Sequence, residues 1–226
     1  MPQLTIVFDL DGTLVDTAPD LVDTLNVILA REGLPPIPYA DGRTMIGGGA
    51  RKMIELGLTA DRHAFTAGDI DRLFRDFIAH YSAHIADRSR PFPGLVDALD
   101  QLAARGCRFA VCTNKLERLS RLLLDALGLG ARFSAICGPD TFDVHKPNPE
   151  ILLRTILQAG GSVSHAVMVG DSAKDIDTAR AAGVPVVAVD FGYTDAPVAQ
   201  FGPDRIIGEF RDLPAAVFSL AGTGRP

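Results

Sequence analysis

Two hydrophobic patterns divide the chain. From Leu21 to Ile85, apolar residues recur every three or four positions, most regularly after Ile70, and this spacing predicts amphipathic helices. After a breaker at residues 90–94, short continuous apolar runs alternate with helical patterns, which favours a parallel sheet with helices on both faces. One apolar run, residues 4–10, precedes the helical block. We assign it to the same sheet, because an isolated strand is not stable.

The helical block is therefore an insertion after the first strand. The expected architecture is an α/β fold, with a parallel sheet domain formed by residues 1–16 and 89–226 and an all-helical domain formed by residues 17–88. The remaining strands are expected at residues 107–113, 133–137, 165–171 and 184–190, with a short edge strand at 204–208 and a last helix near 213–220.

The first helix of the insertion has sequence signals at both ends. Thr17 and Asp20 have the spacing of a capping box, and Pro19 lies in the first turn. Gly33 ends the apolar periodicity. Further on, three glycines at 47–49 predict a flexible turn before a short helical stretch at 50–58.

Composition narrows the possible partners and compartment. The net charge of −6 gives no general attraction for nucleic acid or anionic membranes. The cysteines Cys107, Cys112 and Cys137 are odd in number and lie beside apolar stretches, which predicts buried free thiols in a reducing compartment. The N-terminus lacks the pattern of a signal peptide, and no apolar run approaches the ~20 residues that span a membrane. We therefore expect a cytoplasmic protein.

Two carboxylates follow the first strand. Asp9 and Asp11 are separated by one residue, and residues two apart in an extended chain point to the same side. Two like charges held together are unfavourable unless a cation or a shared proton compensates them. Fold stability gives no reason for such a pair, so the pair indicates a functional site.

Polar residues also follow later strands or lie in a nearby loop: Thr113, Asn114, Lys146, Asp171, Ser172 and Asp175. In doubly wound sheets, ligands bind beyond the carboxyl ends of the strands, so these side chains are expected to meet at one edge. Mg²⁺ prefers carboxylate oxygens and would compensate Asp9 and Asp171. Asp9 could then attack phosphorus, while Asp11 protonates the leaving oxygen and later activates water.

The phosphoryl group would be held by the remaining polar groups. Lys146 supplies a compact positive charge, and Thr113 with the backbone amides near Asp11 and Gly12 would bind the phosphoryl oxygens. Each residue alone has a simpler interpretation, because helix-capping aspartates, turn-forming threonines and surface lysines are common. The agreement of four segments along one chain favours a catalytic site.

These segments resemble the four motifs of the haloacid dehalogenase-like superfamily. The matching residues are Asp9-Leu-Asp-Gly-Thr13, Thr113 with Asn114, Lys146-Pro147 and Gly170-Asp-Ser-Ala-Lys-Asp175, which together cover nearly the whole chain. The resemblance implies a Rossmann-like core with a helical cap inserted after the first motif. It also implies Asp9 as the nucleophile and Asp11 as the acid/base. Mg²⁺ would be held by Asp9, the Asp11 backbone carbonyl and Asp171, with Ser172 and Asp175 supporting these ligands and Asn114 contacting the substrate.

Residues 9–21 and 46–55 look like those of phosphoglycolate phosphatases. The founding dehalogenases lack an Asp at the position of Asp11, so its presence argues for phosphoryl rather than halide chemistry. The β-phosphoglucomutase branch usually has a His near position 20, where this chain has Asp20. Phosphonoacetaldehyde hydrolases use a cap lysine as a Schiff base, and the sequence around Lys52 does not obviously desolvate it.

The sequence therefore predicts a Mg²⁺-dependent phosphatase of a small phosphorylated metabolite, with 2-phosphoglycolate as the leading candidate. We expect a monomer or homodimer without nucleic-acid or membrane partners. A phosphomutase or a pyrophosphatase on the same core is the alternative enzyme, and a mutase would release no phosphate. A receiver-like phosphoacceptor module clusters similar residues, but such modules are about half this length and lack the helical insertion. A binding-only pseudoenzyme is disfavoured, because no motif residue is missing.

The insertion is expected to recognise the carboxylate of phosphoglycolate, because the core charges serve the phosphate. The best candidate is the segment 47–52, where glycines allow close backbone approach and the following helix directs amide hydrogens at an anion. Arg51 adds a guanidinium that can hold a carboxylate with two parallel hydrogen bonds. The simpler interpretation is a loop with an exposed arginine, and Arg43 is the second choice.

Overall fold

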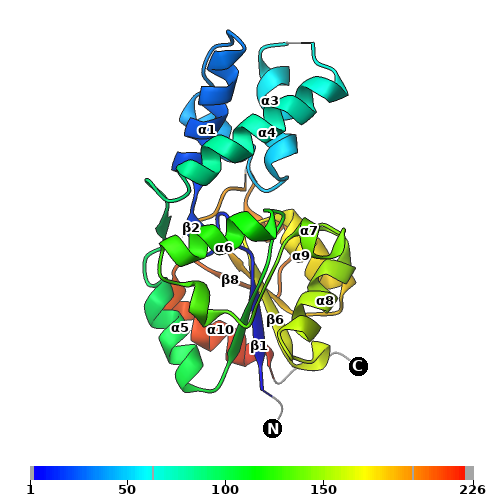
Figure 1. Ribbon diagram of the computed structural model, residues 1–226. Coiled ribbons are helices and arrows are strands. Elements are labelled where there is room, and N and C mark those ends of the chain that lie inside the picture. The colour runs from blue at the N-terminus through cyan, green and yellow to red at the C-terminus, as the bar shows by residue number, and fades with distance from the viewer. Residues whose placement is uncertain (1–2, 63, 195, 222–226) are drawn as a thin grey trace.

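A parallel sheet forms the core of the protein, and a group of helices lies above one edge of it (Figure 1). The computed structural model describes residues 3–62, 64–194 and 196–221. The sheet strands are β1 (Thr5–Phe8), β4 (Arg108–Cys112), β5 (Ala135–Cys137), β6 (Ala166–Gly170), β7 (Val186–Val189) and β8 (Arg205–Ile207). They pair in the order β5-β4-β1-β6-β7-β8, and every pair is parallel. The predicted α/β fold is confirmed, including the short edge strand β8.

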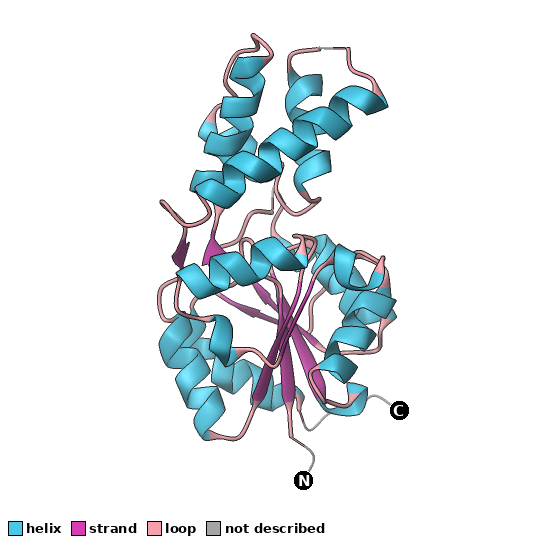
Figure 2. Ribbon diagram, viewed as in Figure 1, coloured by secondary structure: helices cyan, strands magenta, loops and turns pink. Residues whose placement is uncertain are grey.

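Helices cover both faces of the sheet (Figure 2). Alternate strand residues point to opposite faces, so Val7 of β1 packs in one apolar cluster while Ile6 and Phe8 pack in the other. The Val7 side is covered by α8 (Pro149–Gln158) and α9 (Ala173–Ala181). The opposite side is covered by α5 (Leu95–Ala104), α6 (Glu117–Ala126) and α10 (Leu213–Leu220). Burial of these continuous apolar strands is what holds a sheet of this kind together.

In the described residues, four helices form the group above the sheet. They are α1 (Ala18–Arg31), α2 (Tyr39–Thr44), α3 (Ala50–Ala60) and α4 (Ala67–Ala83). The predicted stripe on α4 is buried at Ile70, Leu73, Phe77 and Tyr81. Helix α2 has no such stripe, because Gly42 is its one buried residue, and its six residues were not predicted from periodicity.

The capping box predicted at Thr17 is wrong. Thr17 is the N-cap of α1, but its side chain makes no capping hydrogen bond. Asp20 instead turns to the far end of the insertion, where its carboxylate accepts hydrogen bonds from the backbone N–H groups of Arg88 and Ser89 and from the Ser89 hydroxyl. A tertiary partner has therefore replaced the local one that the spacing suggested. A capping box does form at Thr66 and Asp69, at the start of α4.

A short antiparallel ribbon joins the helices to the sheet. It pairs β2 (Val15–Asp16) with β3 (Arg90–Pro91), so the chain leaves and re-enters the core at adjacent points. Two-residue strands carry no periodicity, and the ribbon was not predicted. The remaining short elements are α7 (Pro139–Phe142) and the 3₁₀ turns η1 (Gly130–Arg132), η2 (Val163–His165), η3 (Val198–Phe201) and η4 (Phe210–Asp212).

Two predictions from composition can be compared with the described residues. Cys107, Cys112 and Cys137 are all buried and free of disulfides, as predicted. None of the described helices combines the length and the hydrophobicity needed to cross a lipid bilayer.

Candidate active site

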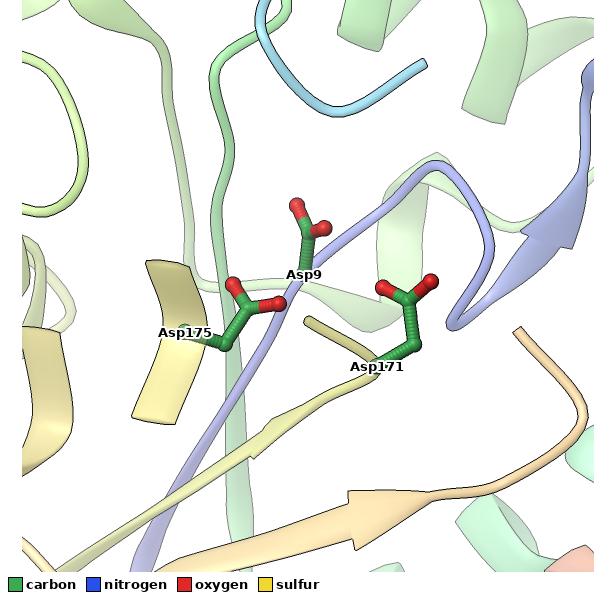
Figure 3. A group of neighbouring side chains, drawn as sticks. All are labelled: Asp9, Asp171 and Asp175. Atoms are coloured by element: carbon green, nitrogen blue, oxygen red, sulfur yellow. The ribbon is translucent and has the colours of Figure 1, made fainter. Parts of the chain in front are cut away.

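Three buried carboxylates gather beyond the ends of β1 and β6 (Figure 3). Asp9 follows β1, Asp171 follows β6 and Asp175 lies in the first turn of α9; one oxygen of each lies within 4.8 Å of the others. The two strands are neighbours, and the Asp9 N–H donates to the Val169 carbonyl at 2.9 Å. The strand order reverses around β1, with β4 on one side and β6 on the other, and this is where doubly wound sheets bind ligands.

Lys146 lies between two of these carboxylates. Its Nζ donates to Asp175 Oδ1 at 2.6 Å and lies 2.8 Å from Asp9 Oδ1, and the side chain is almost wholly buried. Burial favours the neutral amine, but the charges of Asp175 and Asp9 outweigh it and raise the pKa of Lys146 above its usual value. Asp175 also accepts hydrogen bonds from the Ser172 N–H and hydroxyl, which completes the capping box of α9. Asp175 therefore both caps α9 and forms the ion pair with Lys146.

Asp171 accepts hydrogen bonds from two residues that are far apart in the sequence, Thr13 and Tyr193. Its Oδ1 accepts a hydrogen bond from the Thr13 hydroxyl at 3.1 Å, and its Oδ2 accepts one from the Tyr193 N–H at 2.7 Å. Gly12 has a φ of +86°, and a Cβ at this position would lie 2.5 Å from Asp171 Oδ2. Only glycine therefore fits at position 12. Tyr193 was missed by sequence reasoning, because a tyrosine in a loop after β7 carries no motif of its own.

The carboxylate cluster is poorly compensated. Burial, with the nearby Asp175 and Asp11 charges adding to it and Lys146 opposing it, raises the pKa of Asp9 to about 6. Burial and the charges of Asp175 and Asp9 raise the pKa of Asp171 to about 8. Among the described residues, Asp9 Oδ1 has no partner in hydrogen-bond geometry. A divalent cation that prefers oxygen ligands fits this cluster.

Asp11 forms a separate buried ion pair with Lys115. The Lys115 Nζ donates to the two Asp11 carboxylate oxygens at 2.9 and 3.2 Å. It also lies 4.5 Å from the centre of the Tyr81 ring, which comes from α4. Burial disfavours the charged amine, but Asp11 outweighs this effect and raises the pKa of Lys115 above its usual value. Sequence reasoning missed Lys115; the available signal was its place three residues after the end of β4, beside Thr113 and Asn114.

Thr113 and Asn114 shape the loop after β4. The Thr113 hydroxyl accepts a hydrogen bond from the Lys115 N–H at 3.2 Å, which is the simple turn that the sequence allowed. The Asn114 side chain donates to the carbonyls of Gly47 and Lys146, both at 3.2 Å, and accepts from the Lys146 N–H at 2.9 Å. Asn114 therefore links the glycine-rich loop of the insertion to the lysine loop of the sheet domain.

A cavity of about 350 Å³ lies between the sheet edge and the helices above it. On the sheet side it is lined by Asp9, Asp11, Thr113, Lys115 and Lys146. The helical side is mostly apolar, and its lining includes Leu21, Ile46, Met53, Phe74, Phe77, Ile78 and Tyr81. Charged and apolar groups thus face each other across one space, as in many small-molecule sites.

The two candidate arginines occupy different positions. Arg51 lines the cavity, but its guanidinium donates to Asp71 at 2.6 Å, stacks 4.4 Å above the Phe74 ring and is about half exposed. Arg43 donates to the carbonyls of Phe191 and Gly192, in the loop after β7. Arg43 therefore ties the helical insertion to the sheet domain.

Comparison with known proteins identifies the family. Residues 6–189 match the model of the haloacid dehalogenase-like hydrolases. The chain belongs to this family. A phosphoglycolate phosphatase from Caulobacter vibrioides is 50% identical over 216 residues, which are 96% of this chain and 91% of the relative. An N-acetylmuramic acid 6-phosphate phosphatase from Pseudomonas aeruginosa is 35% identical, covering 92% of each chain.

A solved structure gives the same result for the fold. The crystal structure of a predicted phosphoglycolate phosphatase from Haemophilus somnus superposes with a TM-score of 0.87 at 31% identity, covering 95% of this chain and 97% of that one. The resemblance stated from the sequence motifs is therefore confirmed. Membership of a hydrolase family sets aside the receiver-like signalling module.

Proposed function

We propose that the protein is a Mg²⁺-dependent phosphatase of a small phosphorylated acid, and that this acid is 2-phosphoglycolate. The substrate is supported by the relative from Caulobacter vibrioides, with which the chain shares 50% of residues. The observation that carries the chemistry is the pair of carboxylates Asp9 and Asp11 on one cavity wall, with Lys146 2.8 Å from Asp9. We place the enzyme in the cytoplasm, because three buried free thiols suit a reducing compartment. We propose a monomer or homodimer.

The reaction would proceed in two steps on the sheet domain. In the first step, an Asp9 carboxylate oxygen forms a bond to phosphorus while the ester P–O bond breaks, and Asp11 gives a proton to the leaving oxygen. In the second step, Asp11 takes a proton from water, the water oxygen bonds to phosphorus, and the Asp9–phosphorus link breaks. Inorganic phosphate and glycolate are the products, and Asp9 returns to its starting form.

Asp9, Asp171 and the backbone carbonyl of Asp11 would hold Mg²⁺, and Asp175 and Ser172 would support them. When bound, Mg²⁺ supplies positive charge that offsets the clustered carboxylates and the phosphate oxygens. Lys146 adds charge at the transferring group.

The remaining residues would orient the phosphoryl group and close the site. The Thr113 hydroxyl and the backbone amide of Asp11 would donate to phosphoryl oxygens. The Gly12 N–H donates to the Val15 carbonyl at 3.0 Å, and the Asn114 side-chain amide donates to the carbonyls of Gly47 and Lys146, so these two residues would support the loops around the phosphate. Residues 17–88 would act as a cap domain that covers the site, joined to residues 1–16 and 89–226 through the ribbon of β2 and β3.

A larger phosphorylated acid is the second candidate. The helical wall of the cavity is largely apolar, and phosphoglycolate has almost no apolar surface to place against it. The relative at 35% identity is a phosphatase of N-acetylmuramic acid 6-phosphate, a sugar phosphate that also carries a carboxylate. A substrate of this kind would use the apolar wall more fully.

One panel tests the proposal. Phosphate release is measured with Mg²⁺, with EDTA and with Mg²⁺ restored, on phosphoglycolate, N-acetylmuramic acid 6-phosphate, sugar phosphates, nucleotides and pyrophosphate. The proposal expects the highest kcat/KM on phosphoglycolate and no turnover in EDTA. Isomerisation of a sugar phosphate without phosphate release would point to a phosphomutase, and preference for pyrophosphate to a pyrophosphatase.

A further inference from the structure

Among the described residues, two lysines and one arginine line the cavity, and their environments differ. Lys146 belongs to the carboxylate cluster, between two of its members. Arg51 is half exposed and pairs with Asp71, which does not line the cavity. Lys115 is only 7% exposed, and Asp11 is its one ion-pair partner among the described residues. Lys115 is thus the buried cation whose partner is the candidate acid/base.

The pair with Lys115 occupies the carboxyl group of Asp11. Both Asp11 oxygens accept hydrogen bonds from the same ammonium group, at 2.9 and 3.2 Å. A carboxyl group that gives a proton to a leaving oxygen needs one of its oxygens at that oxygen. An ammonium has three donor hydrogens and can turn toward another anion in the cavity. A second anion would therefore compete with Asp11 for Lys115.

Tyr81 places an unused donor beside Lys115. Its side chain is 1% exposed, it lines the cavity from α4, and its hydroxyl hydrogen has no acceptor in the described part of the chain, because the neighbouring Lys115 ammonium can only donate. A buried hydroxyl without an acceptor is unfavourable, and an anionic oxygen is the acceptor that would satisfy it. The Lys115 ammonium already lies 4.5 Å from the centre of the same ring. Two donors from different domains thus face one part of the cavity.

We infer that Lys115, with Tyr81 beside it, binds the carboxylate of the substrate, and that this contact releases the Asp11 carboxyl group for proton transfer. This inference rests on the proposed function, in which the phosphate lies at Asp9. A phosphate ester without a carboxylate leaves Lys115 on Asp11 and is turned over slowly. Selection for acidic substrates then acts on the catalytic step as well as on binding.

The main test compares two substrates that differ at the carboxylate. kcat and KM are measured on phosphoglycolate and on ethyl phosphate for Lys115→Met, Lys115→Arg, Tyr81→Phe and Arg51→Ala. In Lys115→Met, the ratio of kcat/KM for phosphoglycolate to that for ethyl phosphate should fall about ten- to a hundredfold, the effect of one charged hydrogen bond. Part of the fall should be in kcat. Tyr81→Phe should lower the ratio by about two- to tenfold.

Two controls separate recognition from charge and folding. Arg72→Met removes an exposed cap charge that pairs with Glu32, outside the cavity, and should keep the wild-type ratio. Lys115→Arg keeps the positive charge and should retain most of the ratio that Lys115→Met loses. Equal losses on both substrates in Lys115→Met would overturn the inference, because Lys115 would then serve Asp11 alone. A ratio that falls in Arg51→Ala and not in Lys115→Met would assign the carboxylate to Arg51.

A second measurement does not need phosphoglycolate as a substrate. Glycolate carries the carboxylate without the phosphate, and its inhibition of ethyl phosphate hydrolysis is measured in the same variants. Weaker inhibition in Lys115→Met, but not in Arg72→Met, supports the inference even if the wild type rejects phosphoglycolate and the proposed substrate fails. Equal inhibition of wild type and Lys115→Met would contradict it.

Discussion

The sheet side of the cavity carries buried ionisable groups, whereas the helical side is mostly apolar. Asp9, Asp11, Lys115 and Lys146 are all held in ion pairs on the sheet side. Burying charges is costly and adds little to stability even when they are paired, so such an arrangement is explained by chemistry. Apolar residues such as Phe77 stabilise the insertion and exclude water from the site. On our proposal, the reaction takes place on the sheet side, and the substrate is selected at the boundary between the two sides.

The largest effect on turnover is expected for Asp9→Asn, which removes the proposed nucleophile on the sheet side. The amide is a poor nucleophile, so turnover should fall by roughly 10⁴- to 10⁶-fold, the range seen when one member of a catalytic unit is removed. The fold should persist, because the substitution preserves the shape of the side chain. Steady-state phosphate release and a thermal melt measure the two effects. A preparation free of contaminating phosphatase that keeps a substantial fraction of the wild-type rate would exclude Asp9 as the nucleophile.

Asp11→Asn should have the next largest effect. One carboxyl group serves as acid and then as base, and such catalysis is typically worth ~10²–10⁴-fold. The loss should be larger for an alkyl phosphate than for p-nitrophenyl phosphate, whose leaving group needs no proton. If both substrates react at the wild-type rate, Asp11 has another role.

Removal of metal should make the stability of the sheet side depend on pH. The folded-state pKa values of Asp9 and Asp171, about 6 and about 8, lie above their ordinary value of 3.8. The folded protein then binds more protons than the unfolded chain, so this contribution to stability is greatest at low pH and is lost as pH rises through 6 and 8. In EDTA, the melting temperature should fall between about pH 5 and pH 8, and Mg²⁺ should reverse the fall.

Asp171→Asn is the control for this pH dependence. The amide does not ionise, so the EDTA melting curve of the variant should change less with pH, and its turnover should need a higher Mg²⁺ concentration. An EDTA melting temperature that rises over this range in the wild type, and an unchanged Mg²⁺ requirement in Asp171→Asn, would contradict the assignment of Asp171 to the metal.

The smallest effect is expected for Arg51→Ala, at the half-exposed arginine that lines the cavity from the helical side. The sequence alone predicts that Arg51→Ala costs about 1.5–3 kcal/mol in kcat/KM for phosphoglycolate, as for a hydrogen bond to a charged group. In the structure, Arg51 is half exposed and pairs with Asp71, and exposed pairs are worth about 0–1 kcal/mol. We therefore expect Arg51→Ala to cost about 0–1 kcal/mol, which is less than about fivefold in kcat/KM for phosphoglycolate. A tenfold loss confined to carboxylate substrates would restore the role that the sequence predicts.

Site residues at the ends of strands could be predicted from the sequence, because the local hydrophobic pattern shows where each strand ends. Asp9 and Asp171 end continuous apolar runs, and parallel strands place their carboxyl ends at one edge. Lys115 lies three residues after β4 and was within reach of the same reasoning, but its burial beside Tyr81, which comes from a helix of the insertion, could not be predicted from local pattern. The capping box at Thr17 failed for a related reason: Asp20 binds Ser89, 69 residues away, and a local spacing carries no information about such a partner.

The central claim, that Asp9 carries the phosphoryl group, has a direct test. Phosphoglycolate and Mg²⁺ are mixed with excess enzyme, quenched in acid within the first turnover, and the peptides are examined by mass spectrometry. The account predicts the added mass of one phosphoryl group on the peptide that contains Asp9, labile to hydroxylamine, absent in Asp9→Asn and longer-lived in Asp11→Asn. Phosphate released at the normal rate with no modified Asp9 peptide at any quench time, or a label on a different residue, would contradict it.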